Sequence, residues 1–309
     1  MKKITSDYWK QRQTQYFKNI EKDEDKLFKQ LAKEYNKEAK RLDDLIASYY
    51  TKYGEDNVIE YKNLLTNLSF EDKQSLMQDM NTFFGNYPEL EHLRPVSQSA
   101  YKINRLEALE YEITKQQIEL GLKEEQMGLD MMRKGFNETY ERVIKDMGFS
   151  GVMTRKELMQ DIVNSKWIGG RNFSDSIWGN KEKLIDFMTN DFKNGVIRGD
   201  NYNTMGNLLK ERFNKRSAND IKRLIYTEGT FVQNQAMAKP FEDMGYTHYF
   251  YDAIMDERTT DTCEGLNGQR FAFEDKASGD NFPPMHAWCR SSFTVDLDSR
   301  IEVQNENNV

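Results

Sequence analysis

FKQLAKEYNKEAKRLDDLIASY, residues 28–49, decides the fold of this chain. Lys, Glu and Asp fill the positions between its large apolar residues, which recur at spacings of three, four and seven: Phe28, Leu31, Tyr35, Leu42, Ile46 and Tyr49. Such spacing places a single apolar stripe along an α-helix. The stretch therefore predicts a long amphipathic helix that buries one face against other helices.

A second run with the same rhythm extends over residues 101–145, where the apolar positions are Leu106, Leu109, Ile113, Leu120, Met127 and Met131. Gly121, Gly128 and Gly135 recur in it every seven residues and so share one helix face. They predict either bends in the helix or the close approach of a partner helix. Shorter helices are expected over 181–194, 205–213 and 218–239, and Ser174 is a candidate cap.

The five prolines help to divide the chain, because proline disrupts the interior of a helix. They are Pro88, Pro95, Pro240, Pro283 and Pro284. After Pro240 the pattern changes, since residues 247–253 form a short β-type run and glycine-rich turns follow it. The predicted fold is α+β, with mostly long α-helices over residues 1–240 and a small carboxyl-terminal mixed α/β or β-hairpin module. Four regions are expected: an amino-terminal helical region 1–95, a middle helical region 96–222, the module 223–297 and a flexible tail 298–309.

Composition excludes several classes of protein. Two cysteines are too few for a disulfide framework in 309 residues. A membrane-spanning helix needs roughly 20 apolar residues in a row, and the sequence contains no such stretch. It also lacks the glycine-rich lysine motif with which nucleotide-hydrolysing motors hold phosphate. We therefore expect a protein of a reducing, aqueous compartment that neither enters a membrane nor drives DNA packaging with ATP.

The amino-terminal segment combines aromatic and basic residues. The first 50 residues hold 12 Lys and Arg against 9 Asp and Glu, although the whole chain has a net charge of −7. The candidate contact residues for double-stranded DNA or a partner helix are Trp9, Lys10, Arg12, Tyr16 and Lys18. Stacking on bases is one interpretation. Burial of the aromatic rings in a core or an interface is the other, and it is favoured.

The carboxyl-terminal module concentrates the groups that could carry chemistry. Cys263, His286 and Cys289 form a candidate zinc site, with Asp261, Asp256 or water as the fourth ligand. The favoured alternative is two reduced, buried thiols beside a histidine that is hydrogen-bonded to the backbone. A cysteine hydrolase is disfavoured, because a thiolate needs a positive environment and residues 240–309 carry 14 acidic against 5 basic residues.

Residues 223–295 present an ordered series of motifs. Arg223, Thr227, Glu228 and Asn234 lie on one expected helix, and Gly245 precedes the strand at 248–251. Asp256-Glu257-Arg258-Thr259 follows, and then Cys263, Leu266 and Gly268. The series closes with Pro284-Met285-His286-Ala287-Trp288-Cys289-Arg290. In this order the residues resemble the phage Mu F-like head morphogenesis family of minor capsid, or minor head, proteins.

Three positions depart from the family pattern. Ala287 stands where members often have proline, and Thr260 and Ser291 stand near positions where members often have further cysteines. Fewer thiols argue against a site with four protein ligands. Independently of the family, Asp256 and Arg258 are spaced to lock the module through charge-assisted hydrogen bonds, and Arg290 is expected to pair with a nearby carboxylate.

The resemblance implies a role in the virion and no enzymatic activity. It implies a minor capsid protein of a tailed phage that acts in procapsid assembly at the portal vertex and in DNA packaging or ejection. The expected partners are the portal protein, a scaffold or major capsid protein and double-stranded DNA. The expected location is the interior of the phage head, and the host cytoplasm during assembly.

Overall fold

The computed structural model describes residues 6–94, 103–149, 156–211, 213 and 217–301. Long helices and a three-stranded antiparallel sheet make up the chain, which confirms the predicted α+β class. The chain divides into two compact units. Unit 1 comprises residues 1–29, 125–176 and 221–309, and unit 2 comprises residues 30–124 and 177–220. Each unit is thus assembled from separated segments and cuts across the predicted regions. Most of the tail predicted at 298–309 lies outside the described residues.

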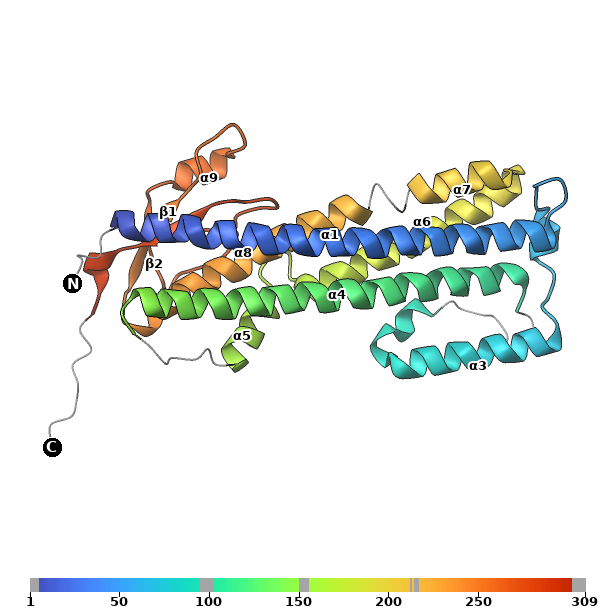
Figure 1. The fold of residues 1–309 in the computed structure, drawn as a ribbon, viewed down its shortest axis with the longest axis horizontal. Coiled ribbons are helices and arrows are strands. Elements are labelled where there is room, and N and C mark those ends of the chain that lie inside the picture. The colour runs from blue at the N-terminus through green and yellow to red at the C-terminus, as the bar shows by residue number, and fades with distance from the viewer. Residues whose placement is uncertain (1–5, 95–102, 150–155, 212, 214–216, 302–309) are drawn as a thin grey trace. The chain divides into compact units, whose positions relative to one another are not determined.

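Three helices form the frame of unit 1. They are the first part of α1 (Ser6–Tyr53), the last part of α4 (Arg105–Asp146) and most of α8 (Ser217–Asp243). In Figure 1 the α1 and α4 segments of this unit run side by side in opposite directions. The Thr139 hydroxyl of α4 donates a 2.9 Å hydrogen bond to the Gln233 side-chain oxygen of α8 in a buried position. The short helix α5 (Lys156–Val163) completes this helical part.

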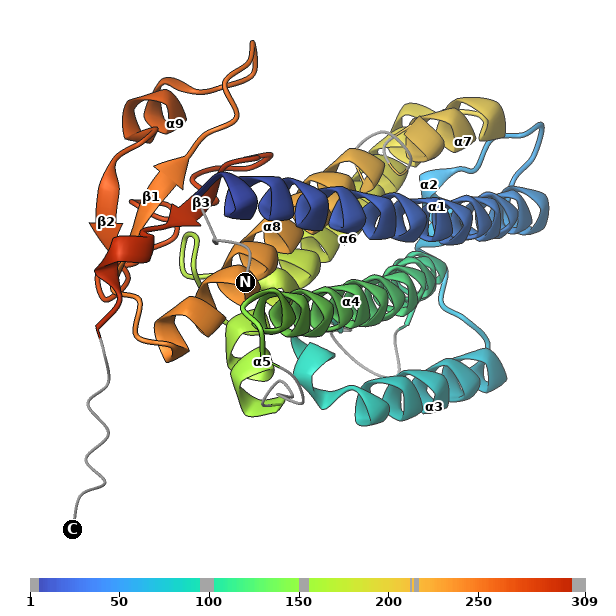
Figure 2. The same cartoon turned by 60° about the vertical axis from the view of Figure 1, so that its left-hand side comes forward.

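A small sheet lies beside these helices. Its strands β1 (His248–Asp252), β2 (Arg270–Ala272) and β3 (Ser292–Val295) have the order β2-β1-β3, and both pairings are antiparallel. The helix α9 (Asp261–Leu266) connects β1 to β2 (Figure 2). The Gln13 amide of α1 donates to the carbonyl oxygen of Phe293 on β3, which ties the two ends of the chain together. Trp9, Phe241 and Tyr249 share the core of this unit with Phe293.

Unit 2 is a helical bundle. It contains the rest of α1 and α4, most of α6 (Phe173–Arg198), and four shorter elements: α2 (Tyr61–Leu64), α3 (Phe70–Asn86), η1 (Pro88–Leu93) and α7 (Tyr202–Glu211). The α1 stripe predicted from the sequence is buried here, since Leu31, Leu42 and Ile46 are each at most 1% exposed. That result confirms the helical interpretation of residues 28–49.

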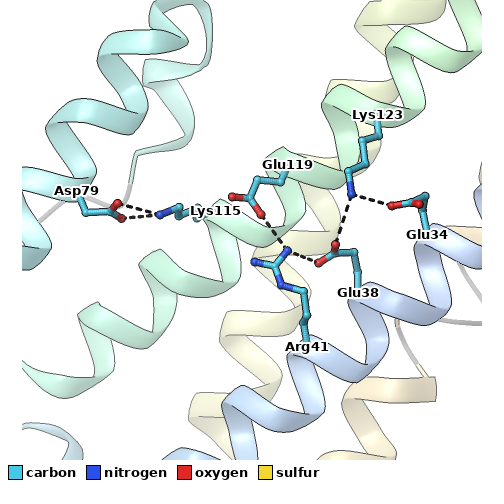
Figure 3. A network of polar contacts seen from close by, with 7 residues as sticks. All are labelled: Glu34, Glu38, Arg41, Asp79, Lys115, Glu119 and Lys123. Atoms are coloured by element: carbon cyan, nitrogen blue, oxygen red, sulfur yellow. Dashed lines mark hydrogen bonds and ion pairs between the residues drawn. The ribbon is translucent and has the colours of Figure 1, made fainter.

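Ion pairs join the helices of unit 2 (Figure 3). Arg41 of α1 contacts Glu38 at 2.8 Å and Glu119 of α4 at 2.9 Å. Lys123 of α4 contacts Glu34 of α1 at 2.7 Å and Glu38 at 3.8 Å. Because Glu38 is almost fully buried, it gains from having both cations nearby. The alternating charges hold α1 and α4 in one register.

The glycines of α4 mark close approaches. A β-carbon at Gly128 would lie 2.3 Å from the Phe173 ring, and one at Gly121 would lie 3.0 Å from the Trp178 ring. At Gly135 the nearest atom, from Ile20, is 3.6 Å away, which is an ordinary contact. The partner-approach alternative is thus confirmed at two of the three positions.

Two predictions about helix ends are wrong. The helix α6 begins with a reciprocal pair, in which the Asn172 side chain accepts from the Asp175 amide at 2.8 Å and the Asp175 carboxylate accepts from the Asn172 amide at 3.2 Å. The Ser174 hydroxyl instead donates to Glu125 of α4. The helix α8 continues three residues past Pro240. Because proline has no backbone N–H, α8 lacks one intrahelical hydrogen bond at this position, and it ends at Asp243, less than one turn later.

Candidate metal centre in unit 1

Cys263, His286 and Cys289 converge in unit 1. Cys263 lies on α9, and the other two lie on the turn that leads into β3, which is closed by a 3.1 Å hydrogen bond from the Cys289 amide to the His286 carbonyl. Tyr251 of β1 and Met285 pack against the two thiols in a small apolar cluster. The sheet and α9 therefore bring together residues that are separated by more than 20 positions in the sequence.

The distances fit a tetrahedral metal ion. The Cys263 sulfur lies 3.3 Å from the His286 Nε2 and 3.9 Å from the Cys289 sulfur, and all three ligand atoms lie within 4.8 Å of one another. Zinc–sulfur and zinc–nitrogen bonds of ordinary length at a tetrahedral angle separate two sulfurs by about 3.8 Å and sulfur from nitrogen by about 3.5 Å. Two of the three separations thus match zinc ligation within a few tenths of an ångström.

The imidazole is oriented for ligation. The His286 Nδ1 lies 2.8 Å from the Ala287 carbonyl oxygen, which accepts a hydrogen bond and so assigns the proton to Nδ1. Nε2 then presents its lone pair toward the Cys263 sulfur. Hydrogen bonding of the second ring nitrogen to a carbonyl is the usual support of a metal-bound histidine. The same bond is the backbone contact expected under the alternative interpretation.

The two thiols differ in their tendency to ionise. Burial opposes ionisation of Cys263, but hydrogen bonds with Thr260, Tyr251 and Ser291 outweigh it and lower the pKa of the thiol to about 7. Burial raises the pKa of the Cys289 thiol. A metal ion binds thiolate, so the surroundings of Cys263 favour the form that ligates.

The predicted carboxylate ligands do not join this group. Asp256 is engaged by Arg290 at 2.6 Å and by the Arg258 amide at 2.9 Å. Asp261 is exposed on the first turn of α9. Among the described residues this group therefore offers three protein ligands, and an ion bound there would take its fourth ligand from water or another small molecule.

Motif residues of α8 support this turn. The Thr227 hydroxyl donates to the Arg223 carbonyl at 2.7 Å and accepts from the Trp288 amide at 3.2 Å. The fully buried Asn234 donates to the Ser291 carbonyl at 3.3 Å. These motif positions hold the backbone on both sides of Cys289, which is a positioning role.

A second group of motif residues closes the loop that follows β1. The Arg290 guanidinium holds the pKa of Asp256 down at about 2, with a further contribution from the Arg258 amide. The Asp256 amide in turn donates to the Thr259 hydroxyl at 2.8 Å. The expected pairing of Arg290 with a nearby carboxylate is confirmed. Arg258 contributes its backbone to this loop.

Gly268 and Pro284 occupy special backbone positions. Gly268 has a φ of +77°, a value that favours glycine, and its amide donates to the Tyr251 carbonyl at 2.8 Å. Pro284 is buried and follows a cis peptide bond from Pro283. Both residues shape the approach to the candidate ligands.

The last motif residue, Glu228, is a buried acid. It is 4% exposed, and its carboxylate accepts a 2.9 Å hydrogen bond from the Trp167 indole. Burial raises the pKa of Glu228 to about 7, which the bond from Trp167 only partly offsets.

The predicted DNA or partner contacts have different environments. Trp9 and Tyr16 are 2% and 3% exposed, and the Tyr16 hydroxyl donates to Asp146. Arg12 forms a 2.9 Å ion pair with the same Asp146. Lys10 lies 3.6 Å from Asp252 and is half-exposed, and Lys18 is exposed. The rings thus serve the core, as the favoured interpretation expects, whereas the two lysines face solvent.

Comparison with known proteins finds a family match for one region of the chain. Residues 187–294 match a family model described as Phage Mu protein F like protein. No curated protein and no solved structure matches the chain. The matched region confirms the resemblance inferred for residues 223–295 and extends it toward the amino terminus. It includes all three candidate ligands and the α8 residues that position them.

Proposed function

We propose that this protein is a minor capsid protein that acts in head morphogenesis of a tailed phage, at the portal vertex of the procapsid. The family match over residues 187–294 carries the proposal. The matched sheet and α8 share a single core with the amino-terminal part of α1. Among the described helices none is long and apolar enough to cross a membrane. The location proposed with this role is the phage head, and the host cytoplasm before assembly.

The partners that we propose are the portal protein and a scaffold or major capsid protein. Exposed large apolar side chains support a protein partner, since such residues often mark contact surfaces. In unit 2 they include Phe70, 75% exposed, and Ile197, 56% exposed; in unit 1 they include Ile254 and Met255.

Mass spectrometry of gradient-purified particles tests the role in the head. Procapsids and mature virions of the encoding phage should both contain the protein at a few copies per particle. Procapsids assembled without portal protein are the matched control and should lack it. Absence from both particle types would refute the proposed role, and equal amounts with and without portal would refute the portal location.

A role in holding packaged DNA, or in its ejection, is the second candidate. Only the exposed Lys10 and Lys18 of the predicted contacts support it, because Trp9 and Tyr16 are buried. Phosphate contacts release counterions, so the affinity for linear duplex DNA should fall steeply between 50 and 200 mM salt. The slope of log affinity against log salt concentration should be about −0.9 for each phosphate contact. The double variant Lys10→Ala/Lys18→Ala should reduce that slope by about two. A salt-insensitive affinity would rule this role out.

The metal centre binds Zn²⁺ in this proposal, as a structural ion of unit 1. Two thiols and one imidazole are the donor set that suits zinc, and their separations fit tetrahedral bonds. Elemental analysis of the purified chain should find one zinc per molecule. Cys289→Ser should lose it, whereas His92→Gln, which changes an exposed histidine of η1, should keep it. Metal-free wild-type protein that neither takes up zinc nor gains thermal stability from it would contradict the assignment.

A cysteine hydrolase remains the third candidate, favoured only by the 3.3 Å separation of the Cys263 sulfur and the His286 Nε2. Its nucleophile is 3% exposed, which leaves little room for a substrate. Cys263→Ser distinguishes the two roles. Loss of zinc and of thermal stability identifies a structural thiol, whereas loss of a hydrolytic activity with unchanged stability identifies a nucleophile.

A further inference from the structure

The two free thiols of unit 1 lie close enough to react with each other. The Cys263 and Cys289 sulfurs are 3.9 Å apart, and the chain contains no other cysteine. A disulfide joins its sulfurs at about 2.05 Å, so the pair has to approach by roughly 1.9 Å. Rotation about a single Cα–Cβ bond moves a sulfur by such a distance. Cys263 and Cys289 are therefore placed to form one bond within the chain.

The packing around the sulfurs limits what can reach them. Tyr251, Ala253 and Met285 form a buried apolar cluster with the two cysteines, which are 3% and 1% exposed. The Tyr251 hydroxyl donates a 3.3 Å hydrogen bond to the Cys263 sulfur, which ties this thiol to β1. Because the cluster leaves no room for a second polypeptide, cross-linking between copies of the chain is blocked. The packing thus favours a reaction within the pair.

A small oxidant has a route to the pair. A pocket of about 680 Å³, formed within unit 1, is lined in part by Thr260 and His286. The His286 Nε2 lies 3.3 Å from the Cys263 sulfur, and the Thr260 hydroxyl accepts from the Cys263 amide at 3.4 Å. One layer of side chains therefore separates Cys263 from the pocket. Hydrogen peroxide is little larger than water and passes such a layer during ordinary side-chain motion.

We propose that Cys263 and Cys289 form an oxidative modification site, at which a hydroperoxide converts the two thiols into one disulfide. In the first step one sulfur attacks a peroxide oxygen, so that an S–O bond forms, the O–O bond breaks and water leaves with the thiol proton. In the second step the other sulfur attacks the first. The S–S bond forms, the S–O bond breaks, and the hydroxyl leaves as a second water with the second thiol proton. The two sulfurs lose two electrons in total, and the peroxide oxygens gain them.

The disulfide and the zinc ion exclude each other. The inference deepens the proposed metal centre and rests on the proposed function for the ion, whereas the disulfide needs only the two thiols. Metal ions bind thiolates, so oxidation leaves His286 as the single ligand of the group and releases the ion. A reducing host cytoplasm keeps the thiols free, and an oxidising medium outside the cell favours the disulfide. The site thus holds either an ion or a covalent bond, according to its surroundings.

Peptide mapping tests the modification on the full chain. The protein is stripped of metal and reductant, exposed to hydrogen peroxide near neutral pH, and then unfolded in iodoacetamide to label the remaining thiols. Peptides are weighed because the 15 methionines also take up oxygen. The peptides that hold Cys263 and Cys289 should be joined, unlabelled and lighter by two hydrogen atoms in a monomeric chain. Cys289→Ser is the matched control and should yield no joined peptide. Two labelled cysteines, or oxygen added to both without a joined peptide, would overturn the proposal.

A second measurement asks whether the folded chain favours the bond. Wild-type protein without metal is equilibrated with mixtures of reduced and oxidised glutathione, once folded and once in concentrated urea. If the fold holds the sulfurs in place, the equilibrium constant for the disulfide should be at least about tenfold larger in the folded chain. A constant that is equal or smaller in the folded chain would identify inert structural thiols and overturn the proposal.

The zinc-loaded chain separates this inference from the proposed function. It should form the disulfide at least about tenfold more slowly than the metal-free chain, because both sulfurs are coordinated. A zinc-indicator dye should record one ion released for each disulfide formed. A chain that binds no zinc but forms the disulfide refutes the structural ion and supports the modification site. A chain that binds zinc but forms no disulfide after the metal is removed refutes the modification site alone.

Discussion

At the scale of single residues, Glu228 makes the stability of unit 1 depend on pH. Burial raises its pKa to about 7 in the folded chain, above its value in the unfolded chain. The folded state therefore holds the proton more tightly, and this contribution is full below about pH 4.5 and is lost as the pH rises through 7.

Glu228→Gln keeps an acceptor for Trp167 and removes the titration. The difference in free energy of unfolding between variant and wild type should grow in favour of the variant from pH 4.5 to pH 8, reaching a few kcal/mol at most. Urea denaturation at several pH values measures it. A difference that is constant across this range would show that Glu228 does not titrate between the two states.

Individual site residues could be predicted where a motif named them. The Cys263, His286 and Cys289 group was found from residue type and from the spacing of the last two. The burial of Glu24 on α1, which is 8% exposed, could not be predicted, because a buried acid on a charged helix is indistinguishable in sequence from a solvated one. Its burial comes from Gly229, a residue about 200 positions away that permits α8 to approach α1.

At the scale of helices, Gly128 fixes the distance between α4 and the start of α6. Gly128→Ala would force its β-carbon into the Phe173 ring and should destabilise the chain by about 1–3 kcal/mol. Gly179→Ala is the matched control, because nothing lies within 4 Å of its β-carbon. That change should stabilise the chain by about 0.5–1 kcal/mol, through helix propensity. Thermal denaturation measures the change in stability of both variants. Equal changes in melting temperature would contradict the proposed contact between residue 128 and the Phe173 ring.

The buried pair of Lys181 and Glu124 joins α6 to α4 within unit 2. The two side chains lie 2.7 Å apart and are each 3% exposed, and the Tyr35 hydroxyl lies 3.4 Å from the ammonium. Lys181→Met leaves the carboxylate buried and alone, and should cost about 3–5 kcal/mol. The double variant Lys181→Met/Glu124→Leu should recover most of that loss, which a denaturant series would show. A double variant as unstable as the single one would mean that Glu124 has other essential contacts.

The long helices could be predicted from the periodicity of apolar residues in the sequence, whereas the ends of some helices could not. The apolar stripe at 28–49 and the run at 101–145 specify α1 and α4 because burial on one face recurs every three to four residues. The start of α6 could not be predicted, because Asn172 and Ser174 are both good N-cap residues. The reciprocal hydrogen bonds between Asn172 and Asp175 make Asn172 the cap. Short helices such as α5 carry too few turns to show a period.

At the scale of the whole molecule, the two units should respond differently to loss of zinc. A strong chelator should increase amide hydrogen exchange in α9 and β3, because the ion joins them in the proposed site. Exchange in α6 beyond residue 177 should stay unchanged, because that segment belongs to unit 2. Mass spectrometry of peptic fragments reads both regions in one experiment. Equal deprotection of the two units, or none, would argue against a structural ion confined to unit 1.

The division into units was beyond the reach of the sequence. Composition and proline placement suggested consecutive regions, whereas α1 and α4 each contribute to both units. The sequence of a continuous amphipathic helix does not show where along the helix one set of packing partners gives way to another. The contacts that define the units, such as Gln13 with Phe293, join positions 280 residues apart.

The bond between Gln13 and Phe293 has a consequence for biosynthesis. Trp9 and Tyr16 leave the ribosome well before part of the core that covers them, because Phe293 and Val295 are synthesised nearly 300 residues later. Until then the nascent helix exposes its aromatic rows to chaperones and to other chains. A polypeptide that stops before β3 therefore lacks part of the core of unit 1 and leaves Trp9 and Tyr16 incompletely covered.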